Sequence, residues 1–79
     1  MNVQEIINII KGHAIEIIPK LEDHNFKPDD ALKDLGANSI DRSEIIMMTL
    51  ETLSLNIPLI HIARAENIGE LAGILHEKL

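Results

Sequence analysis

The sequence predicts an all-α fold, a four-helix bundle with a long first connection and a short third helix. Apolar residues recur at steps of three and four in several stretches, which is the spacing of one face of a helix. No stretch alternates between apolar and polar residues as a half-buried strand would. A chain of 79 residues holds one small core, so we expect a single domain over residues 1–79.

The first predicted helix runs from Val3 to Ile18. Asn2 followed by Glu5 is the pattern of a capping box, in which each side chain accepts a bond from the other residue's backbone N–H. Pro19 ends the helix because proline has no N–H and clashes with the preceding turn. The apolar series of this segment is Val3, Ile7, Ile10, Ala14, Ile17, Ile18 and Leu21.

Residues 20–38 form a long connection that has no sustained period. We expect a short helical turn over Pro28–Leu32, because proline suits a first helical position and the two aspartates that follow favour the positive end of a turn. Four apolar side chains are expected to pin the connection to the core: Leu21, Phe26, Leu32 and Leu35.

The second predicted helix runs from Ser39 to about Ser54. Its cap is Asn38 or Ser39, since both residue types accept hydrogen bonds from free N–H groups at a helix start. Pro58 marks the end of this segment, because the residue before a proline avoids helical geometry.

Two further helices are predicted in the last third of the chain. The third is short and spans about Leu59–Ala65. The fourth begins at Asn67, and Glu70 three residues later repeats the capping pattern. Its apolar face comprises Ile68, Leu71, Ala72, Leu75 and Leu79.

Charge and composition exclude several classes of partner. The chain has 13 acidic residues against seven Lys and Arg, a net charge of −6, and Phe26 as its one aromatic residue. It is therefore not expected to bind nucleic acid, which needs basic surfaces and aromatic platforms. The charge favours basic protein partners instead. The apolar runs are too short to span a membrane, and no membrane partner is expected.

Other features argue against a metal site and against catalysis. The histidines (His13, His24, His61 and His76) are far apart and lack the spacing of metal ligands. The chain has no cysteine, which fits the cytoplasm. A domain of this size has no room for a deep pocket, so the chain is not expected to be an enzyme.

The most informative stretch is Leu35-Gly36-Ala37-Asn38-Ser39-Ile40-Asp41. It places a hydroxyl group in the first turn of a helix, after a glycine turn and beside a carboxylate. On local grounds Ser39 could simply cap the helix. Alternatively, its hydroxyl is exposed for covalent modification by a phosphate group, which the free N–H groups and positive dipole of a helix start would stabilise.

This stretch resembles the modification site of acyl carrier proteins. The following Glu-Ile-Ile-Met helix, the Asn-Ile-Pro segment and the closing Asn67-Ile68-Gly69-Glu70-Leu71-Ala72 are similar to the same family. The resemblance implies that a phosphopantetheinyl transferase loads 4′-phosphopantetheine from coenzyme A onto Ser39. The thiol of this arm would then hold acyl groups as thioesters. The resemblance also places Asp41 within reach of the metal site or basic residues of the transferase. Asn38 and Asp41 are predicted, with Ser39, as the cofactor-binding residues.

Two departures from the family pattern point to a subfamily. Asn38 stands where carriers usually have aspartate, and Leu59–Ala65 stands where fatty-acid carriers have an acidic run. The Asn-Ser-Ile-Asp-Arg sequence is similar to freestanding carriers of polyketide β-branching cassettes. That similarity implies a monomeric acetyl donor to an enzyme that resembles hydroxymethylglutaryl-CoA synthase, served by a ketosynthase/decarboxylase or acyltransferase of a polyketide pathway. The alternatives are a general fatty-acid carrier, a peptidyl or D-alanyl carrier, and an unmodified acidic helical adaptor.

The second helix is apolar on two faces. One face carries Ile45, Ile46, Thr49 and Leu53, which we expect in the core. The other carries Ile40, Met47 and Leu50. A bundle helix buries one stripe, so the second is expected to be at least partly exposed beside Ser39 as a docking strip. The alternative is that both stripes belong to the core of a small domain. The predicted docking residues are Ile40, Arg42, Ser43, Met47 and Leu50.

Overall fold

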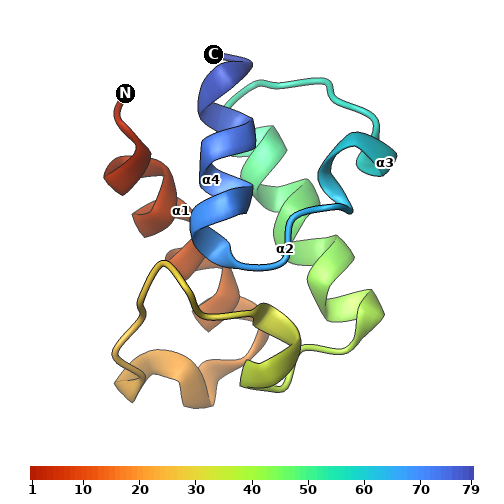
Figure 1. Cartoon of the computed structure of the whole chain (residues 1–79). Helices are drawn as coiled ribbons and strands as arrows, with labels where there is room; N and C mark the ends of the chain where they lie inside the picture. Colours follow the sequence, from red (N-terminus) through yellow and green to blue (C-terminus); the bar gives the residue numbers. More distant parts are fainter.

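The computed structural model describes residues 1–79 and contains helices and no strands, which confirms the predicted fold class. The elements in order are α1 (Val3–Ile17), the 3₁₀ helices η1 (Pro19–Asp23) and η2 (Leu32–Leu35), α2 (Ser39–Thr52), α3 (Leu59–Ile62) and α4 (Ile68–Glu77). Figure 1 shows three longer helices side by side, with the short α3 crossing beside α2. None of these helices is both long and apolar enough to cross a lipid bilayer.

The first helix begins and ends where its local signals place it. The Asn2 side chain accepts from the Glu5 N–H at 2.8 Å, and the Glu5 carboxylate accepts from the Asn2 N–H at 3.0 Å. This confirms the predicted capping box, which satisfies two N–H groups that a helix start leaves free. The helix ends at Ile17, one residue before the predicted end, and Pro19 opens η1.

One apolar core holds the elements together, and α1 packs against both α2 and α4. The largest side chains that are fully buried come from all four helices: Ile6, Ile10, Ile45, Ile62, Ile68 and Leu75. Burial of each such side chain contributes about 1.5–3 kcal/mol. The core is thus almost entirely aliphatic, as the composition indicated. Its one buried polar side chain is Thr49, whose hydroxyl donates to the Ile45 carbonyl at 2.8 Å.

The long connection differs from its prediction. The helical turn expected over Pro28–Leu32 is wrong: one helical turn lies over Leu32–Leu35, and another lies over Pro19–Asp23. The reason is a tertiary contact. The carbonyl of Pro28 accepts from the Gly69 N–H at 2.7 Å, and that of Asp30 accepts from the Ile68 N–H at 2.9 Å. These carbonyls satisfy the start of α4, and they do not bond within a turn at Pro28–Leu32.

The predicted anchors of this connection are confirmed. Leu21 and Leu32 are buried, and Phe26 and Leu35 pack against the core while remaining partly exposed. They fix the connection between α1 and the start of α2.

The last two connections are short and sharply defined. α2 ends in a Schellman motif: Ser54 has a positive φ of 55°, its N–H donates to Glu51, and the Leu55 N–H donates to the Leu50 carbonyl at 2.9 Å. α3 stops at Ile62, before the predicted Ala65. α4 begins after Asn67, whose side chain accepts from the Glu70 N–H at 2.7 Å as predicted.

Candidate functional site

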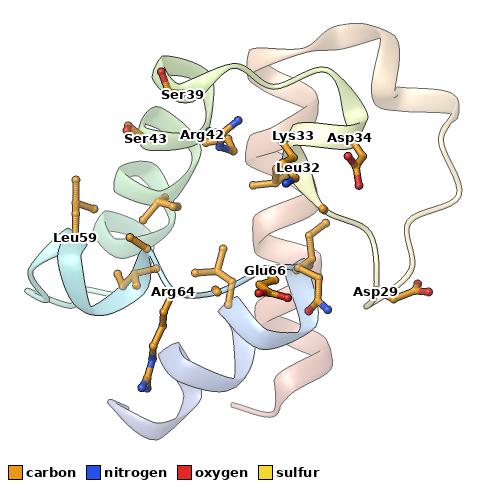
Figure 2. A pocket seen from close by; sticks show the side chains of 18 residues that line it. Asp29, Leu32, Lys33, Asp34, Ser39, Arg42, Ser43, Leu59, Arg64 and Glu66 are labelled. Carbon is orange, nitrogen blue, oxygen red and sulfur yellow. The ribbon is translucent and has the colours of Figure 1, made fainter.

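Ser39 is the first residue of α2, and its side chain is exposed. Gly36 precedes it in a left-handed conformation with φ of 97°, which glycine adopts at no steric cost. This glycine lets the chain turn from η2 into α2. Figure 2 shows the Ser39 hydroxyl at the tip of α2, pointing away from the body of the domain.

Asn38, and not Ser39, caps the helix. The Asn38 side chain accepts from the Asp41 N–H at 2.8 Å, and the Asp41 carboxylate accepts from the Asn38 N–H at 3.2 Å. This reciprocal pair is a capping box. The capping explanation of Ser39 is therefore wrong, and its hydroxyl makes no hydrogen bond within the chain. The structure brings Asn38 and Asp41 together with Ser39 in one turn.

Two backbone N–H groups at this turn have no partner. The amides of Asn38 and Asp41 are taken by the capping box, and that of Arg42 donates to the Asn38 carbonyl at 2.9 Å. Those of Ser39 and Ile40 donate to no group. Free amides and the positive end of a 14-residue helix attract an anion. A phosphodiester on the Ser39 hydroxyl therefore fits the residues present.

A hollow of about 960 Å³ opens beside Ser39, between η2, α2, α3 and the start of α4 (Figure 2). Arg42 and Ser43 line it from α2, and Leu59 lines it from α3. The Arg42 guanidinium donates to the Ala37 carbonyl at 2.8 Å and is half-buried. Arg42 thus contacts the turn before Ser39, although the sequence placed it on a docking surface.

The second apolar face of α2 is exposed only in part. Ile40 is 69% exposed and Met47 57%, and Ser43 is also exposed. Leu50 is only 8% exposed, so its predicted place on an exposed strip is wrong. The Schellman motif turns the chain back at this point, and Leu50 joins the core cluster against which Leu55 packs.

Sequence reasoning missed two exposed apolar residues on α3. Ile60 is 79% exposed and Leu59 42%, whereas Ile62 is buried. A four-residue helix with three large aliphatic side chains cannot turn all of them to one core, and this signal was available in the sequence. α3 lies beside α2, and Leu59 lines the same hollow as Ser39.

No histidine lines the hollow beside Ser39. His24 bonds to the Asp30 carboxylate at 2.9 Å in the first connection, and His13 bonds to Thr52 at 2.8 Å between α1 and α2. The His24 hydrogen bond, followed by the Lys27 N–H, holds the pKa of Asp30 below its usual value. The structure gathers no group of three metal-binding side chains.

Comparisons with known proteins agree with this geometry. Residues 8–75 match the family described as phosphopantetheine attachment site. The polyketide biosynthesis acyl-carrier-protein AcpK of Bacillus subtilis (strain 168) is 47% identical over 79 residues, which are 100% of this chain and 96% of AcpK.

A solved structure is similar over nearly the whole chain. It is the crystal structure of the HMG synthase of the curacin biosynthetic pathway in complex with acetyl donor-ACP. A chain of that structure matches with a TM-score of 0.94 and 51% identity, over 99% of this chain and 100% of the matched chain. The resemblance seen in the motifs is therefore confirmed. The chain belongs to the phosphopantetheine attachment-site family, that of the acyl carrier proteins.

Proposed function

We propose that Ser39 carries 4′-phosphopantetheine and that the chain is a non-catalytic acyl carrier. The observation that carries this proposal is that the Ser39 hydroxyl is exposed and makes no hydrogen bond within the chain. It lies beside the backbone N–H groups of Ser39 and Ile40, which donate to no group. When bound, the group supplies a thiol that holds an acyl group as a thioester, which a chain without cysteine cannot supply itself.

The residues around Ser39 have separate roles in this proposal. Asn38 and Asp41 fix the start of α2 through their capping box. The Asp41 carboxylate also presents a negative charge beside Ser39, to which a phosphopantetheinyl transferase with basic residues would be attracted. We place the carrier in the cytoplasm, with which a cysteine-free chain is consistent, and we propose that it acts as a monomer.

The attachment is tested by intact-mass measurement. The chain is incubated with coenzyme A and a promiscuous phosphopantetheinyl transferase. We expect a gain equal to one phosphopantetheine, absent in Ser39→Ala. Ser43→Ala is the matched control, because it removes an exposed hydroxyl one helical turn away and should still be loaded. No gain with several transferases would contradict the proposal.

We further propose that the acyl group is acetyl and that it goes to a synthase of the hydroxymethylglutaryl-CoA type in polyketide β-branching. Support comes from the two relatives, one named for polyketide biosynthesis and the other in a complex of HMG synthase with an acetyl donor-ACP. A ketosynthase/decarboxylase or acyltransferase of the pathway would supply the acetyl group.

The proposed docking surface consists of Ile40, Ser43 and Met47 on α2 with Leu59 and Ile60 on α3. These residues are exposed, α2 begins at the proposed attachment site, and α3 lies beside α2. No acidic residue lies in α3, so a mainly basic partner surface would not fit there. An apolar partner surface would.

The acetyl-donor proposal is tested by transfer. The acetylated carrier, labelled in its acetyl group, is mixed with a β-branching synthase of the hydroxymethylglutaryl type. We expect label on the synthase, and much slower labelling from an acetylated fatty-acid carrier under the same conditions. Equal transfer from both carriers would contradict a specific donor role while leaving the attachment at Ser39 intact.

A further inference from the structure

We infer that Arg42 is a positioning residue for loading of Ser39, which it serves by locking the turn that precedes α2. The inference rests on the proposed function, because it concerns the reaction at Ser39. It assigns Arg42 an internal task in place of the partner contact expected from the sequence.

The turn before Ser39 is hydrogen-bonded at every residue. The Gly36 N–H donates to the Lys33 carbonyl at 3.3 Å, and the Ala37 N–H donates to the Leu32 carbonyl at 3.1 Å. The Asn38 N–H enters the capping box. Ser39 is therefore the first residue after the turn whose backbone N–H is free.

The carbonyl of Ala37 depends on Arg42 for its hydrogen bond. It is buried, with 3% of its surface exposed, and no backbone N–H donates to its carbonyl. The Arg42 guanidinium supplies the donor, at 2.8 Å. The same residue also donates its backbone N–H to the Asn38 carbonyl. Arg42 thus fastens the first turn of α2 to the two residues that precede Ser39.

Removing this side chain would leave the Ala37 carbonyl without a partner. A buried carbonyl does not stay unpaired when the chain can move, so the turn would shift toward water. Ser39 lies two residues further on. In loading, its hydroxyl oxygen forms a bond to the phosphate of coenzyme A that bears pantetheine, the pyrophosphate bond breaks, adenosine 3′,5′-bisphosphate leaves, and the hydroxyl proton passes to a base of the transferase. This attack requires the hydroxyl in one geometry. A displacement of about 1 Å is enough to slow such a step strongly.

Arg64 offers a matched comparison. It is also an arginine, lines the same hollow, and makes no hydrogen bond in the chain. Figure 2 shows its side chain directed away from α2, whereas the Arg42 side chain lies between α2 and η2. Replacing either arginine therefore removes the same charge and the same residue type, but only the replacement of Arg42 removes the hydrogen bond to the Ala37 carbonyl.

The first measurement is the rate of loading of the apo chain by a phosphopantetheinyl transferase. We expect Arg42→Met to lower kcat/KM by roughly ten- to a hundredfold. Arg64→Met should stay near the wild type. Arg42→Lys keeps a charged donor and should recover most of the rate. Loading of Arg42→Met at the wild-type rate would overturn the inference.

The second measurement is amide hydrogen exchange, which needs no transferase. We expect faster exchange at Ala37 and Asn38 in Arg42→Met, with the amides of the buried Ile45 and Thr49 unchanged. Slow loading with unchanged exchange at Ala37 would mean that Arg42 contacts the transferase directly, and would overturn the positioning role. If the wild-type chain is not loaded at all, the proposed function is wrong, while exchange still decides whether Arg42 holds the turn.

Discussion

At the residue scale, Gly69 sets how closely α4 approaches the first connection. A Cβ atom there would lie 3.0 Å from the Pro28 carbonyl oxygen and 3.1 Å from the Pro28 Cβ. The Gly69 N–H also donates to that carbonyl at 2.7 Å. An added methyl group must therefore displace backbone, and cannot be absorbed by a flexible side chain.

We expect Gly69→Ala to lower the free energy of unfolding by about 1–2 kcal/mol, a typical cost of overpacking. Gly73→Ala is the matched control, because nothing lies within 4 Å of its added Cβ. It should raise stability by about 0.5–1 kcal/mol through helix propensity. Urea unfolding measures both. Equal stability of the two variants would show that the approach to Pro28 is not tight.

Asp41 combines a structural and an electrostatic role at the same turn. Asp41→Ala removes its half of the capping box and should cost about 0.5–1 kcal/mol. We expect loading by the transferase to slow more than this loss explains, because a negative charge beside Ser39 is removed. Asn38→Asp keeps the capping oxygen, should fold normally, and should widen the range of transferases accepted. Equal loading of both variants and the wild type would mean that this charge has no role.

Asp30 makes the free energy of unfolding depend on pH in the acidic range. Its pKa in the folded chain lies below the usual 3.8, because His24 and then the Lys27 N–H stabilise the carboxylate. The stabilisation is therefore present above about pH 4 and is lost as the pH falls through the folded pKa. Asp30→Asn should flatten the fall of unfolding free energy as the pH decreases below about 4. An unchanged slope would show that this carboxylate does not contribute.

At the element scale, α2 has a single apolar face toward the core and a shorter exposed strip than its sequence suggested. Met47→Glu should change stability by no more than about 0.5 kcal/mol, because Met47 is largely exposed, and should sharply reduce acetyl transfer. Met47→Leu, which stays apolar, should keep transfer. Leu50→Glu should instead cost about 3 kcal/mol or more, because it places a charge in the core.

Thermal unfolding and transfer assays on the same samples separate these effects. If Met47→Glu unfolds, Met47 belongs to the core and the docking surface does not exist as described. If it folds and transfers acetyl as well as the wild type, Met47 takes no part in docking.

The elements differ in how far the sequence predicts them. The starts of α1 and α4 follow from Asn2, Glu5 and Asn67, whose capping contacts span three residues. The absence of a helical turn over Pro28–Leu32 could not be predicted, because the Pro28 carbonyl accepts a hydrogen bond from Gly69, far along the chain. The burial of Leu50 depends in the same way on how the chain turns back at Leu55.

In the candidate site too, features set by neighbouring residues could be predicted, and features set by the path of the chain in space could not. Ser39 was identified from a motif of neighbouring residues, and its exposure fits that motif. Whether Asn38 or Ser39 caps the helix could not be decided from residue type, since both side chains can do so. The bond from Arg42 to the buried Ala37 carbonyl was also not predicted, because it depends on the path of the turn in space.

At the scale of the whole molecule, the proposed attachment site and the chain ends lie at different ends of the bundle. Figure 1 shows both termini at the end opposite to the start of α2. A purification tag at either terminus should therefore leave loading of Ser39 unchanged. Tagged and untagged chains with different loading rates would show that a terminus reaches the site.

The most direct test of the attachment is to locate it in the loaded chain. Trypsin cleaves after Lys33 and Arg42, so peptide 34–42 contains Ser39 as its one serine, while Ser43 and Ser54 fall in peptide 43–64. We predict that mass spectrometry of the digest finds one phosphopantetheine on peptide 34–42 and none on peptide 43–64. Phosphopantetheine on peptide 43–64, or on neither peptide, would contradict the assignment of Ser39.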